Sequence, residues 1–278
     1  MNTKLKITTF LLAGLLLSIS SLETRAADAS INSDPEKDKI LVYILRNILT
    51  RSHFVVKDMN DDFSEYVFTE FIDGLDPNKR YFTKKDIKDF SKFKYEIDDQ
   101  LLREDLSFYN LVYDRFTNKI KNAKSYYGDL LVQPFNFKKE ETIEVDYENV
   151  PFAENENELK DYWRKQLKLS TLFRIQDKIE KQKENIEEEK EIKIKTFTEF
   201  EKEARLEVLK NMDELYVRIE ELEHEDWFST FLNSVVGAFD PHTSYMAPDI
   251  KERFDQDMSG KLEGIGARLQ KRMDYIKI

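Results

Sequence analysis

Five residues near the end of the chain include the three side-chain types of a serine hydrolase. Asp240, His242 and Ser244 stand in one short stretch with Pro241 and Thr243. A Ser-His-Asp triad takes its members from separate segments, so that each side chain orients the next. The spacing therefore favours a local turn. In that turn Asp240 and Ser244 satisfy free backbone groups, Pro241 fixes the chain and His242 bridges to a neighbour.

Other patterns that carry chemistry are weak in this sequence. The histidines are His53, His224 and His242, and the chain has neither a HExxH nor an EF-hand pattern, so we predict no metal site. Gly264 and Gly266 fall short of a dinucleotide-binding loop, because Leu follows where the third glycine belongs. A GxSxG elbow is also absent. We identify no catalytic residue and expect no cofactor.

Long helices must position these residues, because glycine and proline are scarce. The 278 residues include 7 Gly and 6 Pro, and neither occurs in residues 152–236. A sheet-rich enzyme needs both residue types at many turns. Apolar residues instead recur at three- and four-residue spacing. The sequence therefore predicts a mainly α protein built from long helices.

Capping residues and apolar stripes predict where each helix begins and ends. Thr83 with Asp86, and Asn155 with Glu158, provide two helix starts. The expected helices run over 35–49 on one apolar stripe, 60–74, 83–127 with one break near 103–105, 155–177, 197–222, 227–239 and 248–258. A polar connector is expected at 128–151, with a short strand at 142–145.

Two segments depart from this helical pattern. Residues 178–195 are mostly Lys and Glu, which is typical of a solvated helical arm or hairpin tip, and the alternative is a coiled coil that docks a partner. Residues 262–269 and 275–278 alternate apolar and polar side chains, which predicts two β-strands.

The charge balance argues against two classes of partner. Lys and Arg number 44 against 55 Asp and Glu, a formal net charge of −11 at pH 7. Such a chain repels nucleic acid and anionic lipid, and it has no concentrated basic stripe. We therefore expect no nucleic-acid partner. Aromatic residues make up 13% of the chain, which is ample for a packed core.

The N-terminus predicts export. Lys4 and Lys6 precede an apolar run at 7–19, and small residues at 24 and 26 suit a signal peptidase, so we expect cleavage after Ala26. The alternative is an uncleaved anchor, but the apolar run is shorter than the roughly 20 residues of a membrane span. The chain has no cysteine, which excludes a lipid-anchored lipoprotein and any disulfide.

The sequence contains two longer motifs, at 74–82 with Asp76 and Pro77, and at 239–248 with Asp240, Pro241, His242, Thr243 and Ser244. It also contains a shorter stretch at 262–267 with Gly264 and Gly266, and the single residues Tyr162, Trp163, Arg174, Trp227 and Phe228. Together these residues resemble one family, the tail-specific (C-terminal processing) proteases of the bacterial periplasm. The resemblance covers about residues 35–278, with the motifs in the family's order.

This resemblance implies three parts: a signal peptide at 1–26, an N-terminal helical domain at 27–259 and the truncated start of a PDZ domain at 260–278. In the family, the PDZ domain binds the C-terminal tail of a substrate, and a Ser-Lys core cuts proteins with apolar C-termini. The stretch 240–244 precedes the PDZ domain there and supplies no nucleophile, so the matching motif residues are structural. We expect a periplasmic chain that is inactive without the missing core.

The expected partners are protein substrates with apolar C-termini and an envelope adaptor protein, with no membrane span once the signal is cleaved. A different class of function also fits the sequence, namely a stand-alone helical scaffold of the cell envelope that uses residues 178–195 as its contact surface. A reading frame that continues into a PDZ domain and a Ser-Lys core supports the protease, and a stop codon supports the scaffold.

We predict that the tail from about residue 260 is marginally stable, because a lone hairpin is barely stable in water. Hydrogen exchange of the monomer checks this, with fast exchange expected at Ile265 and Ile276. Strong protection of both amides would show that the strands have found a complete sheet.

Overall fold

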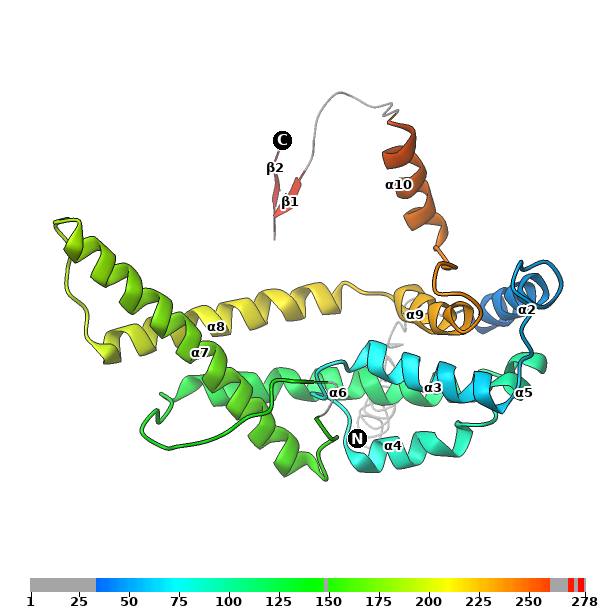
Figure 1. Ribbon diagram of the computed structural model, residues 1–278, viewed down its shortest axis with the longest axis horizontal. Helices are drawn as coiled ribbons and strands as arrows, with labels where there is room; N and C mark the ends of the chain where they lie inside the picture. Colours follow the sequence, from blue (N-terminus) through cyan, green and yellow to red (C-terminus); the bar gives the residue numbers. More distant parts are fainter. Residues whose placement is uncertain (1–33, 148–149, 261–269, 273–274, 278) are drawn as a thin grey trace, which may run out of the picture. The chain divides into compact units, whose positions relative to one another are not determined.

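The computed structural model describes residues 34–147, 150–260, 270–272 and 275–277, and this part of the chain is mainly helical, as predicted (Figure 1). The helices are α2 (Pro35–Arg51), α3 (Asp61–Leu75), α4 (Lys84–Phe90), α5 (Ile97–Leu102), α6 (Ser107–Val132), α7 (Glu156–Glu187), α8 (Phe197–Glu220), α9 (His224–Gly237) and α10 (Pro248–Ser259), with a 3₁₀ turn at Ser91–Phe93. None of these helices has an apolar stretch suited to crossing a lipid bilayer.

A short antiparallel pair follows the helices. Strand β1 (Gln270–Arg272) pairs with β2 (Tyr275–Lys277). Strand β2 lies within residues 275–278, where a strand was predicted. The strand predicted at 262–269, with Gly264 and Gly266, and the signal peptide predicted at 1–26 lie outside the described residues. The assignment of this pair to a PDZ domain stays a prediction.

Helices α3 and α9 form an antiparallel pair in the core. The ring of Phe63, near the start of α3, lies 5.8 Å from that of Phe239, just beyond the end of α9. Gly74, near the end of α3, packs against Thr230 in the middle of α9. Most of α3 therefore lies beside the second half of α9 (Figure 1).

Aromatic side chains join this pair to α6. Phe71 of α3 meets Phe231 of α9 with ring centroids 5.2 Å apart, and Tyr109 of α6 lies 5.0 Å from Phe228 and 5.4 Å from Phe231. All four side chains are at most 2% exposed. Such pairs add about 0.5–1.5 kcal/mol each beyond the burial of their surface. A chain without disulfides relies on this packing.

Helices α7 and α8 form a second antiparallel pair, packed against α6 (Figure 1). Lys178 of α7 bonds Glu207 of α8 at 2.6 Å, and the loop between the helices covers 188–196. No α7 residue beyond Ile175 is buried. The charged segment 178–195 is therefore the exposed outer end of a helical hairpin. A small core of its own, formed by Ile175, Phe200 and Ala204, lies at the base of this arm.

The long helix predicted at 83–127 is divided at two places, and only the break near 103–105 was expected. The additional break lies between α4 and α5. Ser64 of α3 holds the start of α5, because its hydroxyl donates to Asp98 Oδ1 at 2.8 Å and accepts from the Asp98 backbone N–H at 2.9 Å. Both residues are buried, so this contact holds the start of α5 against α3.

The predicted end of α6 near residue 127 is wrong, because the helix continues through Gly128 to Val132. Leu131 is buried, and the Arg205 guanidinium of α8 donates to the carbonyls of Leu131 at 2.6 Å and Val132 at 3.0 Å. These bonds satisfy carbonyls that a helix end leaves free. Glu201 completes the group by accepting from Arg205 Nε at 2.9 Å.

The strand predicted at 142–145 is also wrong, because these residues belong to no strand. The connector instead makes a single parallel bridge, between Ala153 and Thr83, in which the backbone N–H of Lys84 donates to the Ala153 carbonyl at 2.8 Å. A segment with alternating side chains forms a strand only if it can pair with another strand. In the described residues, no other strand lies beside 142–145.

The apolar stripe predicted on α2 is covered only in part. Leu49 is buried, and Leu41 and Leu45 pack against the core. Ile40, Ile44 and Ile48, along the other edge of the stripe, are about half exposed, at 57%, 47% and 51%.

We predict that Arg205→Met lowers the free energy of unfolding by about 3 kcal/mol, because it leaves Glu201 as an unpaired buried charge and frees two helix-end carbonyls. Urea unfolding measures the loss. The matched control is Lys210→Met on the same helix, an exposed residue in a weak ion pair with Glu214, which should cost under about 0.5 kcal/mol. Equal losses would contradict the importance of the buried pair.

Candidate functional site

Asp76 organises the first motif from inside the protein. Its side chain is fully buried, and its Oδ1 accepts from the backbone N–H of Arg80 at 2.6 Å. Its Oδ2 accepts from the backbone N–H groups of Tyr81 and Phe82, both at 2.9 Å. Burial raises the pKa of the Asp76 carboxyl, and the three amide donors oppose that rise. One carboxyl group thus closes residues 76–82 into a turn.

Arg80 fastens this turn to α7. Its carbonyl accepts from Trp163 Nε1 at 2.8 Å, its guanidinium lies 5.3 Å from the Trp163 ring centroid, and its Nε donates to Gln166 Oε1. Lys79 adopts a left-handed backbone conformation with φ of 52°, which a non-glycine residue rarely takes without support. The support comes from backbone hydrogen bonds, since the Lys79 N–H donates to the Asp76 carbonyl at 3.1 Å and the Arg80 N–H donates to Asp76 Oδ1. This motif therefore anchors the end of α3 to α7.

The second motif is a turn closed by Asp240. Its Oδ1 accepts from the His242 backbone N–H at 3.1 Å, and its Oδ2 accepts from Thr243 Oγ1 at 3.3 Å. The side chains of His242 and Ser244 are exposed. The bridge expected from His242 is made by His53 instead, whose Nε2 lies 3.0 Å from Thr243 Oγ1. Among the described residues, no hydrogen bond joins Ser244 to a base.

Asn233 fixes the chain where it leaves this turn. The backbone N–H of Tyr245 donates to Asn233 Oδ1 at 2.8 Å, and Asn233 Nδ2 donates to the Tyr245 carbonyl at 3.1 Å. Only Met246 and Ala247 then separate Tyr245 from Pro248, the first residue of α10. The sequence analysis missed Asn233, because α9 carries several other polar residues and no local signal shows that this one binds a residue 12 positions ahead.

The two motif turns are not brought together. The turn at 76–82 follows the end of α3, and the turn at 240–244 follows the end of α9. Because α3 and α9 are antiparallel, these turns lie at opposite ends of the pair. The 15 residues of α3 span about 22 Å. The motifs are therefore two separate anchors and share no site.

A buried histidine contact has the partner types of a catalytic relay. His224 Nε2 lies 2.7 Å from Asp38 Oδ2, and the Tyr109 hydroxyl lies 3.4 Å from His224 Nδ1. His224 and Asp38 are under 10% exposed, and Tyr109 is fully buried. A substrate cannot reach such a hydroxyl. The contact instead holds the starts of α2 and α9 against α6.

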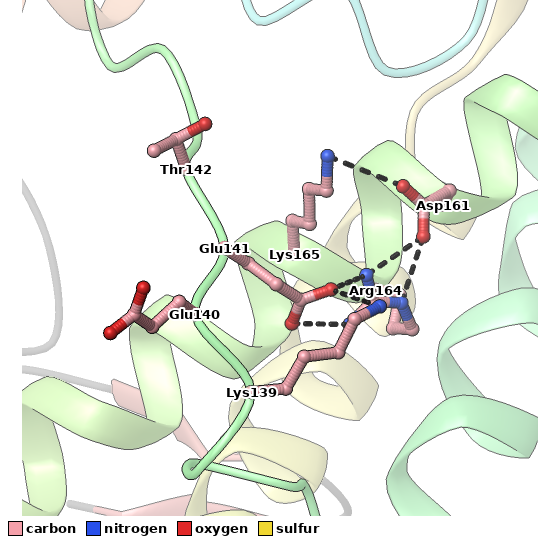
Figure 2. A pocket seen from close by; sticks show the side chains of 7 residues that line it. All are labelled: Lys139, Glu140, Glu141, Thr142, Asp161, Arg164 and Lys165. Atoms are coloured by element: carbon pink, nitrogen blue, oxygen red, sulfur yellow. Dashed lines mark hydrogen bonds and ion pairs between the residues drawn. The ribbon is translucent and has the colours of Figure 1, made fainter.

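A shallow cavity of about 570 Å³ lies between the polar connector and α7, and Figure 2 shows its lining. Arg164 Nη2 donates to Glu141 Oε1 at 2.5 Å, Lys168 Nζ to Glu141 Oε2 at 2.6 Å, and Lys139 Nζ lies 3.0 Å from Glu141 Oε1. On the far side of Arg164, Asp161 accepts from its Nε at 2.9 Å. Glu141 and Asp161 are therefore both bound by cationic side chains of this cavity.

The ion pairs of Glu141 have a structural effect. Arg164, with Lys168 and Lys139, lowers the pKa of the Glu141 carboxyl below its usual range. A carboxylate held ionised by three cations is a poor general acid or base near neutral pH. Within the described residues, no cluster of His, Asp and Glu is suited to holding a metal ion. These ion pairs therefore join the connector to α7.

Comparison with known proteins agrees with the motifs. The chain belongs to the family described as the tail-specific protease N-terminal domain, whose model matches residues 45–249. It is also similar to a tail-specific protease of Haemophilus influenzae, with 27% identity over 256 residues. That alignment covers 91% of this chain and 34% of the relative, so the chain spans about a third of that protein's length. The resemblance inferred from the sequence is therefore confirmed.

We predict that Asp76→Asn destabilises the fold by about 2–3 kcal/mol, because the amide places a donor against buried backbone donors. Thermal or urea unfolding measures the loss. Asp240→Asn is the matched control, since Asp240 is half-buried and closes its turn with longer bonds, and it should cost about 1 kcal/mol. A larger loss at Asp240 would reverse this ranking of the two anchors.

Proposed function

We propose that this chain is the N-terminal helical domain of a periplasmic tail-specific serine endopeptidase. Residues 1–26 act as a cleavable export signal, and residues 260–278 begin a PDZ domain. The complete enzyme cuts proteins that it recognises by apolar C-terminal tails. Its catalytic serine and lysine come from sequence outside this chain.

The family match over residues 45–249 carries this proposal. It contains both anchored turns and all the helices from α3 to α9. The named relative in Haemophilus influenzae supports the activity of the whole protein, since its name is that of a tail-specific protease. Export is supported by the basic and apolar pattern of the first 26 residues.

The arrangement of the described residues suits a framing role. The buried serines Ser64 and Ser234 donate to Asp98 and to the Phe231 carbonyl, and His224 contacts the enclosed Tyr109. A Ser-Lys protease needs a neutral lysine beside its serine, and an oxyanion hole. We therefore propose that the chain is inactive alone and holds the following domains in place.

The exposed arm at 178–195 supports an additional role in docking an envelope adaptor. Some of its lysines form ion pairs within the hairpin, as Lys178 does with Glu207 and Lys195 with Glu203. The small core at its base gives the arm a defined shape without a partner. The same feature favours the second candidate function, a stand-alone scaffold of the cell envelope that binds through this arm.

We predict that the purified chain does not hydrolyse a folded reporter with an apolar C-terminal tail, whereas a chain extended by the downstream coding sequence does. Gel electrophoresis of the reporter measures cleavage, and a reporter with a charged tail is the control. Cleavage by this chain alone contradicts the framing role. A stop codon directly after residue 278, with arm-dependent adaptor binding, favours the scaffold.

A further inference from the structure

The point where the chain leaves the helical bundle is fixed at Tyr245. Its backbone N–H donates to Asn233 Oδ1 at 2.8 Å, and its carbonyl accepts from Asn233 Nδ2 at 3.1 Å. The ring of Tyr245 is partly buried and packs against the core. Beyond it Met246 is 38% exposed, and no residue of α10 is buried. In the described part of the chain, firm attachment to the bundle therefore ends at Tyr245, and we call residues 245–247 the exit segment.

The side chain of Asn233 is itself held in the orientation that this contact needs. Its Nδ2 carries two hydrogens, and one of them donates to the Ser229 carbonyl, one turn earlier in α9, at 2.9 Å. The second hydrogen and Oδ1 bind Tyr245. An amide offers a donor and an acceptor side by side, which matches the N–H and the carbonyl of one backbone residue. A carboxylate has no donor and an ammonium group has no acceptor, so neither makes both bonds.

Two further contacts fix the chain just before the exit segment. Lys57, in the loop between α2 and α3, donates to the Ala238 carbonyl at 2.5 Å. His53 of the same loop lies 3.0 Å from Thr243 through its Nε2 and the threonine Oγ1. The chain is thus attached to the bundle from 238 to 245, and residues 246–247 are the short joint that follows. Joints of a few residues at the ends of elements set how neighbouring parts of an enzyme are placed.

We propose that Asn233 is a positioning residue for cleavage by the complete enzyme. It acts through Tyr245, because by holding the exit segment it limits the directions in which the chain leaves the helical domain. It thereby sets the placement of the domains that follow, without touching the substrate. The effect on cleavage rests on the proposed function, and a misplacement of about 1 Å far from the chemistry can cost about 10²-fold in rate.

Hydrogen exchange of the full chain tests the anchor without any measurement of activity. We expect Asn233→Ala to speed exchange of the Tyr245 amide about tenfold or more, because the amide loses its acceptor. Ser229→Ala is the matched control, since Ser229 is also partly buried on α9 and its hydroxyl donates to the Glu225 carbonyl of the same helix. It should leave the rate unchanged. Equal rates in the natural chain and in Asn233→Ala overturn the proposal.

Spin labels measure whether the exit segment keeps its direction. The natural chain has no cysteine, so Leu206→Cys on α8 and Met258→Cys on α10 create one labelled pair at exposed positions. We expect the distribution of distances between the labels to broaden when Asn233→Ala is added, and to keep its width when Ser229→Ala is added. Distributions of equal width with and without Asn233 show that this side chain does not hold α10, and they overturn the proposal.

A chain extended by the downstream coding sequence tests the effect on cleavage. A folded reporter with an apolar tail has to contact the helical domain and the following domains together, whereas a short peptide with the same tail needs only the catalytic core. We therefore expect Asn233→Ala to lower kcat for the folded reporter about tenfold or more and to change kcat for the peptide by less than about twofold. Ser229→Ala should change neither value. Equal losses on both substrates indicate general destabilisation and overturn the proposal.

Failure of the proposed function has a different result. An extended chain that cleaves neither substrate contradicts the protease assignment, and the role of Asn233 in cleavage is then wrong with it. Hydrogen exchange and the spin-label distances still decide whether Asn233 holds the exit segment, because neither measurement depends on activity.

Discussion

The packing of aromatic side chains between α3, α6 and α9 is the interaction on which the rest of the structure depends. Phe71, Tyr109 and Phe231 meet there in a fully buried cluster. With no disulfide in the chain, the other elements take their positions from these three helices. Helix α2 is tied to the start of α9 through His224, and the two motif turns extend from the ends of α3 and α9.

The features that were predictable from the sequence are local ones. Thr83 and Asp86 are three residues apart and form a capping box, and Asn155 caps α7 through neighbouring backbone groups, so a short window of sequence contains each complete interaction. The motif at 74–82 was recognisable for the same reason, because Asp76 bonds to residues four to six positions ahead. Such contacts need no knowledge of the tertiary fold.

The features that were missed depend on distant partners. Ser64 and Asp98 are 34 positions apart, and Arg205 reaches a carbonyl 74 positions away, so no local pattern reveals the break before α5 or the true end of α6. Periodicity also says which residues share a helix face, but not which face a neighbour covers. The stripe on α2 was predictable, for example, but not that its edge at Ile40, Ile44 and Ile48 is about half exposed in the described structure. Of the candidate site, the family motifs were predictable, while Asn233 and His53 emerged only from the fold.

The pair of hydrogen bonds between Asn233 and Tyr245 has a mechanical consequence. A pull on the chain beyond residue 248 enters α9 through a side chain about one turn before its C-terminal end. The turn at 240–244 lies between these two attachment points. It is therefore relieved of that tension for as long as both hydrogen bonds hold.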